Sequence, residues 1–358
     1  MMYELLKHFP RDSFILVSRI INPSQAQDDR ILDAPMIQID PIGSRVQPMS
    51  FRLLLLPFVA LELVRQIRRF GKQPRNVFAV FPTLDFLLLS AFISRLFGIP
   101  LFVYLHDCIF ETAVSLPQKV IHSMAERLTF RTAVKIYAIS DLMKNYYLRR
   151  GFSLDVLPHG VDMSLVRSSV HPQNCTKPTV GFAGQVYETN DKGIMDLIEA
   201  KRLSGGMIRI QFAMGDVAYL RKLGALESID AIHCFDSHIG VLNFLSDCDV
   251  LFLPMNHESV FWRDLQTIFP TKVTDYWLAQ RPILVYGPEC FAFVRQARDD
   301  GYAKVVMERA PEKILGGIRE ILDSPILADS LVKASRAKIR AHDSTIVAQK
   351  LIKDLGIE

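Results

Sequence analysis

Short apolar segments alternate with helical ones along almost the whole chain, and this alternation restricts the fold more than any other feature of the sequence. The apolar segments are rich in β-branched and aromatic residues, as strands are. In the first half we expect strands at Ser13 to Ser18, Met36 to Ile39, Asn76 to Phe81, Leu101 to Leu105 and Lys135 to Ile139. Continuously apolar strands are typical of parallel sheets covered on both faces. The pattern therefore predicts an α/β protein rather than a sandwich or a helical bundle.

The alternation stops once, in a polar stretch from Met163 to Pro178, which we interpret as a linker. It then restarts with strands expected at Thr179 to Ala183, Met207 to Ala213, Ala231 to Phe235, Val250 to Pro254 and Ile283 to Tyr286. The 358 residues are enough for two cores. We therefore expect two Rossmann-like, doubly wound domains, residues 1–165 and 166–340, facing each other across a cleft at the carboxyl ends of their strands. Residues 341–358 are expected to form a C-terminal helix that could cross back to the first domain.

Several classes of protein do not fit the composition. The five cysteines are never spaced Cys-x-x-Cys, so neither a disulfide framework nor a zinc knuckle is indicated. No run reaches the roughly 18 to 20 apolar residues of a membrane-spanning helix. The N-terminus lacks the charged-then-apolar order of a signal peptide. We expect a cytoplasmic protein, either free or at the inner face of the membrane, with no nucleic-acid partner.

A loop and helix in the second expected domain carry the longest motif. Residues 269–284 read Phe-Pro-Thr-Lys-Val-Thr-Asp-Tyr-Trp-Leu-Ala-Gln-Arg-Pro-Ile-Leu. A helix N-terminus offers free N–H groups and a partial positive charge to a diphosphate. The motif resembles a signature of GT-B glycosyltransferases related to family 4. The resemblance implies that Thr271 belongs to the donor site, that Lys272 lies near the phosphates and that Asp275 accepts hydrogen bonds from the ribose. An ordinary surface helix that opens with a proline is the alternative.

A second motif opens the same domain. Residues 180–187 read Val-Gly-Phe-Ala-Gly-Gln-Val-Tyr, and Asp-Lys-Gly follows from residue 191. This resembles the start of the family's donor domain, which implies that Gly184 approaches the diphosphate and that Lys192 neutralises it. The family often has Arg where this chain has Gln185, so one phosphate-binding charge is missing from the donor site. Taken alone, the glycines indicate a structural turn.

The family also has a pair of glutamates that contact the donor sugar and the ribose. The second matches Asp275, but the position of the first is Thr267. Glu258 follows the apolar segment Val250 to Pro254, where the family presents residues that contact the sugar. Glu258 is therefore a donor-binding candidate, with a solvated loop carboxylate as the alternative.

Two titratable side chains follow an apolar strand in the first expected domain. His106 and Asp107 come directly after Leu101 to Leu105, and Glu111 belongs to the same loop. Ligands of parallel sheets bind beyond this end of the strands, where titratable groups can serve catalysis. Related enzymes have a His or Asp here, beside the reacting carbon, so His106 and Asp107 are the catalytic candidates. A capping or core role is the alternative.

The resemblance covers about Leu101 to Pro288 and implies a function. It implies a hexosyltransferase that moves a sugar from a nucleoside diphosphate sugar to a glycan, a lipid-linked acceptor or another hydroxyl, as in polysaccharide biosynthesis. The resemblance implies retention; an inverting enzyme would instead need a carboxylate base, and Asp107 or Glu111 could serve. No bound cofactor or metal is expected, because cationic side chains and helix ends can neutralise the leaving diphosphate, and His233, His238 and His257 lack a metal-ligand spacing. A sugar-nucleotide epimerase with the GT-B fold and a non-catalytic nucleotide-sugar-binding subunit are the alternatives, and Gln185 and Thr267 favour the latter.

Two further expectations concern the first domain and the hinge. The family begins with a strand and a glycine-rich loop, whereas this chain starts inside what reads as the following helix, so either the start is truncated or that strand is absent. The basic and apolar stretch Ser50 to Arg75 could lie as a peripheral helix on an anionic membrane, or cover a sheet with a cationic last turn. Closure about the linker would bring His106 and Asp107 to the donor residues of the second domain.

Overall fold

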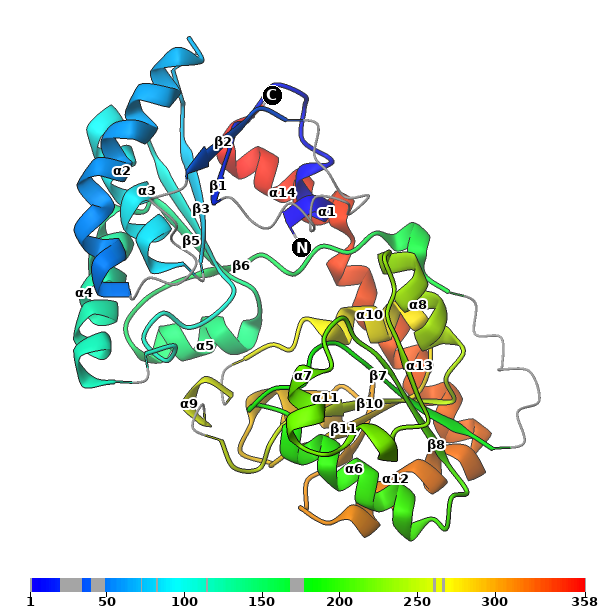
Figure 1. Cartoon of the computed structure of the whole chain (residues 1–358). Helices are drawn as coiled ribbons and strands as arrows, with labels where there is room; N and C mark the ends of the chain where they lie inside the picture. Colours follow the sequence, from blue (N-terminus) through cyan, green and yellow to red (C-terminus); the bar gives the residue numbers. More distant parts are fainter. Residues whose placement is uncertain are drawn as a thin grey trace. The chain divides into compact units, whose positions relative to one another are not determined.

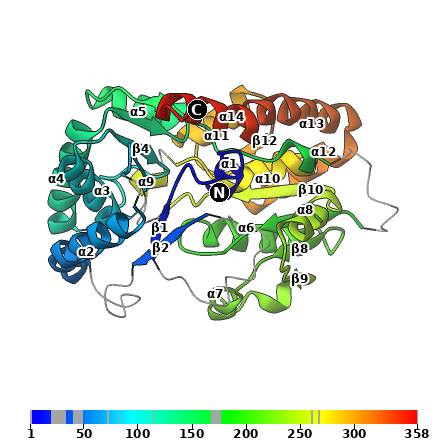
Figure 2. The same cartoon turned by 90° about the horizontal axis from the view of Figure 1, so that it is seen from above.

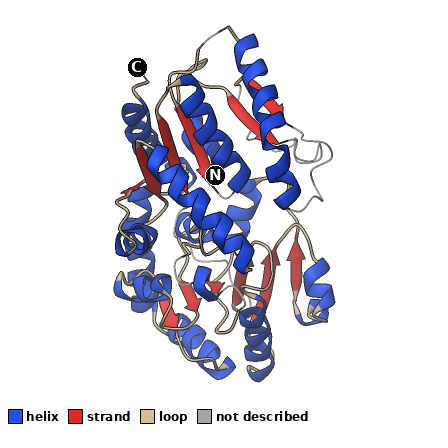
Figure 3. Cartoon of the chain, turned by 90° about the vertical axis from the view of Figure 1, so that its left-hand side faces the viewer, coloured by secondary structure: helices blue, strands red, loops and turns tan. Residues whose placement is uncertain are grey.

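The chain folds into two α/β units in this computed structural model (Figure 1). The structure describes residues 2–19, 34–39, 49–71, 73–81, 83–113, 115–167, 177–259, 262–265 and 268–357. Unit 1 comprises Met1–Gly160 and Thr345–Glu358, and unit 2 comprises Val161–Ser344. The strands of each unit form parallel sheets with helices beside them, which Figure 3 shows in red and blue. This arrangement confirms the predicted fold class.

Unit 1 contains two parallel sheets. The strands β1 (Leu16–Arg19) and β2 (Met36–Ile39) form one pair. The second sheet has the order β3-β4-β5-β6, made by β3 (Val77–Phe81), β4 (Leu101–Leu105), β5 (Lys135–Ala138) and β6 (Asp155–Val156). The helices are α1 (Met2–Leu6), α2 (Met49–Arg69), α3 (Leu84–Phe97), α4 (Leu116–Thr132) and α5 (Asp141–Arg149). Every residue of β4 is buried, as expected for a strand covered on both faces.

The C-terminal helix α14 (Ser344–Leu355) lies almost entirely in unit 1, although unit 2 precedes it in the sequence. Asp354 Oδ2 pairs with Lys135 Nζ at 2.8 Å and accepts a hydrogen bond from the Tyr137 hydroxyl at 2.7 Å. Asn76 donates to the Leu355 carbonyl at 2.9 Å. Asn76 and Lys135 stand at the amino ends of β3 and β5. Helix α14 is therefore anchored opposite the sheet end at which ligands of parallel sheets bind.

Unit 2 has one six-stranded parallel sheet with the order β12-β11-β10-β7-β8-β9. Its strands are β7 (Thr179–Ala183), β8 (Arg209–Ala213), β9 (Ala231–His233), β10 (Val250–Pro254), β11 (Ile283–Tyr286) and β12 (Lys304–Val306). Its helices are α6 (Asp191–Leu203), α7 (Ala218–Lys222), α8 (His238–Ser246), α9 (Trp262–Leu265), α10 (Lys272–Ala279), α11 (Ala292–Asp299), α12 (Pro311–Asp323) and α13 (Pro325–Ile339). Counted within the unit, the strands run 6-5-4-1-2-3, which is the order of a Rossmann fold. Fully buried residues of several strands, such as Phe182, Phe212 and Phe252, form its core.

Two strands were missing from the sequence prediction, namely β6 and β12. They have two and three residues, so neither is long enough to show an apolar pattern. Among the described residues, no helix has the length and apolar character needed to span a bilayer. The middle of the expected linker, residues 168–176, lies outside the described residues.

Candidate functional site

The strand order of unit 2 reverses between β7 and β10, and all seven donor candidates lie on the two segments that follow these strands in the chain. In open α/β sheets, ligands bind at such a reversal, beyond the carboxyl ends of the strands. Gly184 directly follows β7, and Glu258 follows β10. Helix α6, which carries Lys192, comes after β7 in the chain, and helix α10 begins at Lys272.

Gly184 and Lys272 are neighbours in space although 88 positions separate them (272 − 184). Gly184 has a φ of +115°, which side-chain-bearing residues rarely adopt. A Cβ atom at this position would lie 3.3 Å from the Lys272 Nζ atom. Glycine therefore serves both the backbone conformation and the close approach of the lysine.

The Lys272 ammonium group is poorly hydrated. Its Nζ atom lies 4.7 Å from the centroid of the Phe182 ring, which is a favourable cation–π distance. Part of the residue reaches solvent, but desolvation of the ammonium lowers its pKa to about 8. No carboxylate among the described residues pairs with it. A bound anion would therefore strongly stabilise the charged form of Lys272 in this position.

Asp275 lies one turn along α10 and pairs with a histidine of α8. His238 Nε2 is 2.8 Å from Asp275 Oδ1, so this ring nitrogen carries the proton in the contact. The pair orients the carboxylate while its side chain stays partly accessible. From the sequence, His238 was considered only as a possible metal ligand. In the structure, His238 contacts the donor candidate Asp275. Within the described residues, no three His, Cys, Asp or Glu side chains gather as a metal site.

Lys192 and Glu258 form an exposed ion pair, with 3.1 Å between Nζ and Oε2. Arg309, in the segment after β12, lies with Nη1 3.4 Å from the same oxygen. Lys192 and Arg309 hold the pKa of Glu258 below its usual value. Arg309 is a cation that sequence reasoning missed, because β12 itself was missed.

A fully buried asparagine fixes the backbone around these charges. Asn256 Oδ1 accepts a hydrogen bond from the Gly193 N–H at 3.1 Å, and Nδ2 donates to Asp191 Oδ1 at 2.6 Å. The amide group also donates to the Glu188 carbonyl at 2.9 Å. These bonds tie the loop that carries Glu258 to the start of α6, which carries Lys192. Sequence reasoning did not single out Asn256, because its partners come from another segment.

The remaining donor candidates contribute no charge. With its amide oriented to satisfy both groups, Gln185 donates to the Asp216 carbonyl at 3.1 Å and accepts from the Asp216 N–H at 3.3 Å. The Gln185 side chain therefore holds the loop after β8 in place through the backbone of Asp216. Thr271 precedes α10, but its side chain makes no capping hydrogen bond. Thr267 lies outside the described residues.

In unit 1, His106 and Asp107 follow β4 as expected. The His106 ring stands edge-on to Tyr104, with 4.3 Å between centroids, and its Nε2 atom is buried without a hydrogen bond. Burial lowers the pKa of His106 to about 4 and raises that of Asp107. His106 is therefore a neutral imidazole at physiological pH, able to donate or accept a hydrogen bond.

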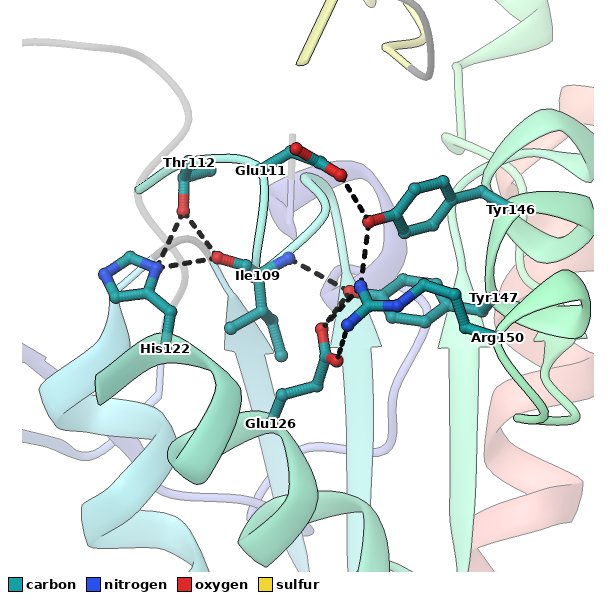
Figure 4. Close-up of polar contacts among 8 residues, drawn as sticks. All are labelled: Ile109, Glu111, Thr112, His122, Glu126, Tyr146, Tyr147 and Arg150. Carbon is teal, nitrogen blue, oxygen red and sulfur yellow. Dashed lines mark hydrogen bonds and ion pairs between the residues drawn. The ribbon is translucent and has the colours of Figure 1, made fainter. Parts of the chain in front are cut away.

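The loop that continues from Asp107 is held by helices α4 and α5 (Figure 4). The Ile109 N–H donates to the Tyr147 hydroxyl at 3.0 Å, and His122 Nδ1 lies 2.7 Å from the Ile109 carbonyl oxygen. The Thr112 hydroxyl also donates to this carbonyl at 2.9 Å. Both backbone groups of Ile109 are thus fixed by side chains.

An ion pair with a buried carboxylate also supports this loop. Glu126 is 1% exposed, and its Oε1 atom lies 2.7 Å from Arg150 Nη2. The Tyr147 hydroxyl donates to the other oxygen of Glu126 at 3.1 Å. Arg150 also donates to the Tyr146 hydroxyl at 2.8 Å, and Tyr146 donates to Glu111 at 2.7 Å. One connected network therefore joins Glu111 in the loop to the buried Glu126 of α4.

The sequence of residues 2–165 matches the family model described as Glycosyltransferase Family 4. No curated protein sequence matches the chain significantly. The comparison with solved structures, in contrast, extends over the whole chain.

Three solved glycosyltransferase structures illustrate this likeness. HepE of Anabaena, in complex with UDP and glucose, is 13% identical with a TM-score of 0.74, and the match covers 100% of this chain and 95% of that one. Sucrose-phosphate synthase of Thermosynechococcus elongatus is 14% identical with a TM-score of 0.70, over 95% and 87%. The lipopolysaccharide outer core galactosyltransferase WaaB, in its apo form, is 14% identical with a TM-score of 0.60, over 92% and 85%. At these identities the likeness establishes the fold. Residues 2–165 thus match the Glycosyltransferase Family 4 model, and the chain as a whole has the GT-B fold of these glycosyltransferases.

Proposed function

We propose that the protein transfers a hexose from a UDP-sugar to a hydroxyl group of a glycan or lipid-linked acceptor. The observation that carries this proposal is the desolvated Lys272 ammonium beside Gly184, at the point where the strand order of unit 2 reverses. The position suits a diphosphate, because the anion would replace the solvation that Lys272 lacks. The choice of UDP is supported by HepE, whose structures contain UDP, UDP with glucose, and UDP-glucose.

Each charged candidate has a place in this scheme. Lys272 would bind the diphosphate. Lys192 and Arg309 would supply further positive charge near the phosphate from which the sugar is transferred. Asp275, oriented by His238, would accept hydrogen bonds from the ribose hydroxyls. Glu258 would contact the sugar. Neutral His106, with Asp107, would lie beside the reacting carbon when the two units close on the substrate.

Retention of the anomeric configuration belongs to the same proposal. In such a reaction the leaving diphosphate assists the incoming hydroxyl, and cationic side chains stabilise the charge that develops on it. A base on the protein would be needed only for inversion. NMR of the product should show the donor's configuration at the anomeric carbon, and an inverted product would contradict this mechanism.

The third part of the proposal is that the transfer needs no metal ion. Lys272, Lys192 and Arg309 are the groups proposed to neutralise the diphosphate in place of a metal. Turnover should therefore persist in EDTA. A loss of turnover that added Mg²⁺ or Mn²⁺ restores would show that the neutralisation is assigned wrongly.

The donor site is tested by calorimetric titration of UDP, ADP and GDP into the full chain. UDP should bind most tightly, and Lys272→Ala should weaken its binding by about thirtyfold, because a charged hydrogen bond is worth about 2 kcal/mol. Lys222→Ala, which removes an exposed lysine of α7, is the matched control and should bind as the unaltered protein does. Equal affinities in all three proteins would refute the donor site.

Turnover measurements separate this function from its alternatives. UDP release from the donor should rise when an acceptor is added. An epimerase would convert the nucleotide sugar without acceptor and without releasing UDP as product. A non-catalytic subunit would bind the donor and leave it intact under both conditions.

A further inference from the structure

Helix α4 of unit 1 exposes a row of apolar side chains. Leu116, Val120, Met124 and Leu128 recur at every fourth residue, and their exposed fractions lie between 37 and 79%. Residues with this spacing share one face of a helix. The opposite face, which includes the buried Ala125, packs into the unit. Helix α4 therefore presents a row of apolar side chains on the face that points away from the unit.

The charges on the outer face of α4 all have one sign. Arg127 and Arg131 are exposed beside the apolar row. Glu126 is the only carboxylate of this fully described helix, and it is buried against Arg150. The outer face of α4 therefore combines apolar groups with guanidinium groups and presents no carboxylate.

The neighbouring helix α3 continues this surface. Helix α3 contacts both α2 and α4, and the three helices lie side by side on one side of the unit (Figures 1 and 2). Phe92 and Leu96 are exposed on α3, and Arg95 is exposed between them. The one carboxylate of α3, Asp85, is buried.

Helix α2 extends the same combination of side chains. Phe58 and Leu61 are exposed in its middle, and Arg65 and Arg68 are exposed toward its end. Its carboxylate, Glu62, accepts a hydrogen bond from Arg65 at 2.9 Å. The exposed side of α2, α3 and α4 is called the α2–α4 face below.

We propose that the α2–α4 face docks onto the surface of an anionic lipid bilayer. Helices that lie on a bilayer bury apolar side chains at the boundary between head groups and acyl chains, and their Lys and Arg side chains reach lipid phosphates. The α2–α4 face offers both groups on three adjacent helices. Its guanidinium groups are complementary to anionic lipid, whereas a protein partner would need a matching acidic surface. Docking would hold the loop with His106 and Asp107, which leads into α4, near lipid-linked substrates.

The proposal is tested by sedimentation of the full chain with vesicles of phosphatidylcholine alone or with about one-third phosphatidylglycerol. The protein should bind the anionic vesicles at low salt, and binding to the zwitterionic ones should be at least tenfold weaker. Val120→Ser with Met124→Ser should abolish binding, because the apolar anchors are lost. Arg127→Gln with Arg131→Gln should weaken it by tenfold or more, since each basic residue near a bilayer adds to the attraction.

Two exposed apolar residues of unit 2 provide the matched control. Met207→Ser with Ile326→Ser should leave vesicle binding unchanged. UDP binding by unit 2 should be the same in all these variants, which keeps the result separate from the proposed donor site, and far-UV circular dichroism should show that unit 1 keeps its helices. The proposal fails if the unaltered protein does not bind anionic vesicles, or if the α4 variants bind them as tightly as the unaltered protein does. It also fails if gel filtration shows that the α4 variants convert a dimer into a monomer, because the face would then join two copies of the chain.

Discussion

At the scale of single residues, the protonation of Lys272 should make the affinity for UDP depend on pH. Its pKa of about 8 in the free protein should rise when a diphosphate binds, because a nearby anion favours the charged form. The contribution of the ammonium to affinity is therefore complete well below pH 8 and is lost as the pH rises through about 8. UDP should bind about tenfold more weakly at pH 9 than at pH 7 in calorimetric titrations.

A lysine-to-arginine replacement provides the control for this pH dependence. Arginine stays protonated throughout this range, so Lys272→Arg should show the same UDP affinity at pH 7 and pH 9. If the unaltered protein also binds equally well at both pH values, the ammonium group of Lys272 does not contact the diphosphate.

Gly184 gives a second prediction at this scale. Gly184→Ala should cost about 1 to 3 kcal/mol of stability because of the positive φ, and should also weaken UDP binding because its Cβ would crowd Lys272. Gly224→Ala shares the positive φ but has open space around the added atom. It should lose stability and keep its affinity. Thermal unfolding and UDP titration of both variants test this, and equal affinities would show that Gly184 has only a backbone role.

At the scale of elements, the network between α4, α5 and the loop after β4 makes Glu126 important for stability. Glu126→Ala leaves Arg150 without its buried partner and should destabilise the protein by about 3 kcal/mol. Glu199→Ala breaks the exposed pair with Arg202 and should cost less than about 1 kcal/mol. Urea unfolding measures both. Similar losses in the two variants would mean that the network does not support the loop.

The elements also show what the sequence could and could not predict. Fully apolar strands such as β4 and β10 were found with their correct ends, because burial on both faces leaves a continuous pattern. Strand β12 has only three residues and was missed, and with it the position of Arg309. The roles of Asn256 and His238 depend on partners distant in sequence, which no local pattern reveals. The motifs did predict that Gly184 and Lys272 belong to one site, because resemblance to a family of known fold indicates which distant segments lie together.

At the scale of the whole molecule, the two units would have different tasks. Unit 2 would bind the nucleotide, and His106 and Asp107 of unit 1 would act on the sugar once the units close about the segment between them. Substitutions in unit 1 should therefore change the rate of the reaction more than the affinity for UDP. Substitutions at Lys272 should change both.

The most direct test of this division is the His106→Asn protein, assayed for UDP affinity and for the rate of UDP release from the donor sugar. Asparagine keeps a polar side chain of similar reach but cannot replace the imidazole beside the reacting carbon. We expect a UDP affinity within twofold of the unaltered protein and a rate lower by about a hundredfold, as is typical when a positioned polar group is lost from a reacting centre. An unchanged rate, or a loss of UDP affinity as large as the loss of rate, would contradict this division.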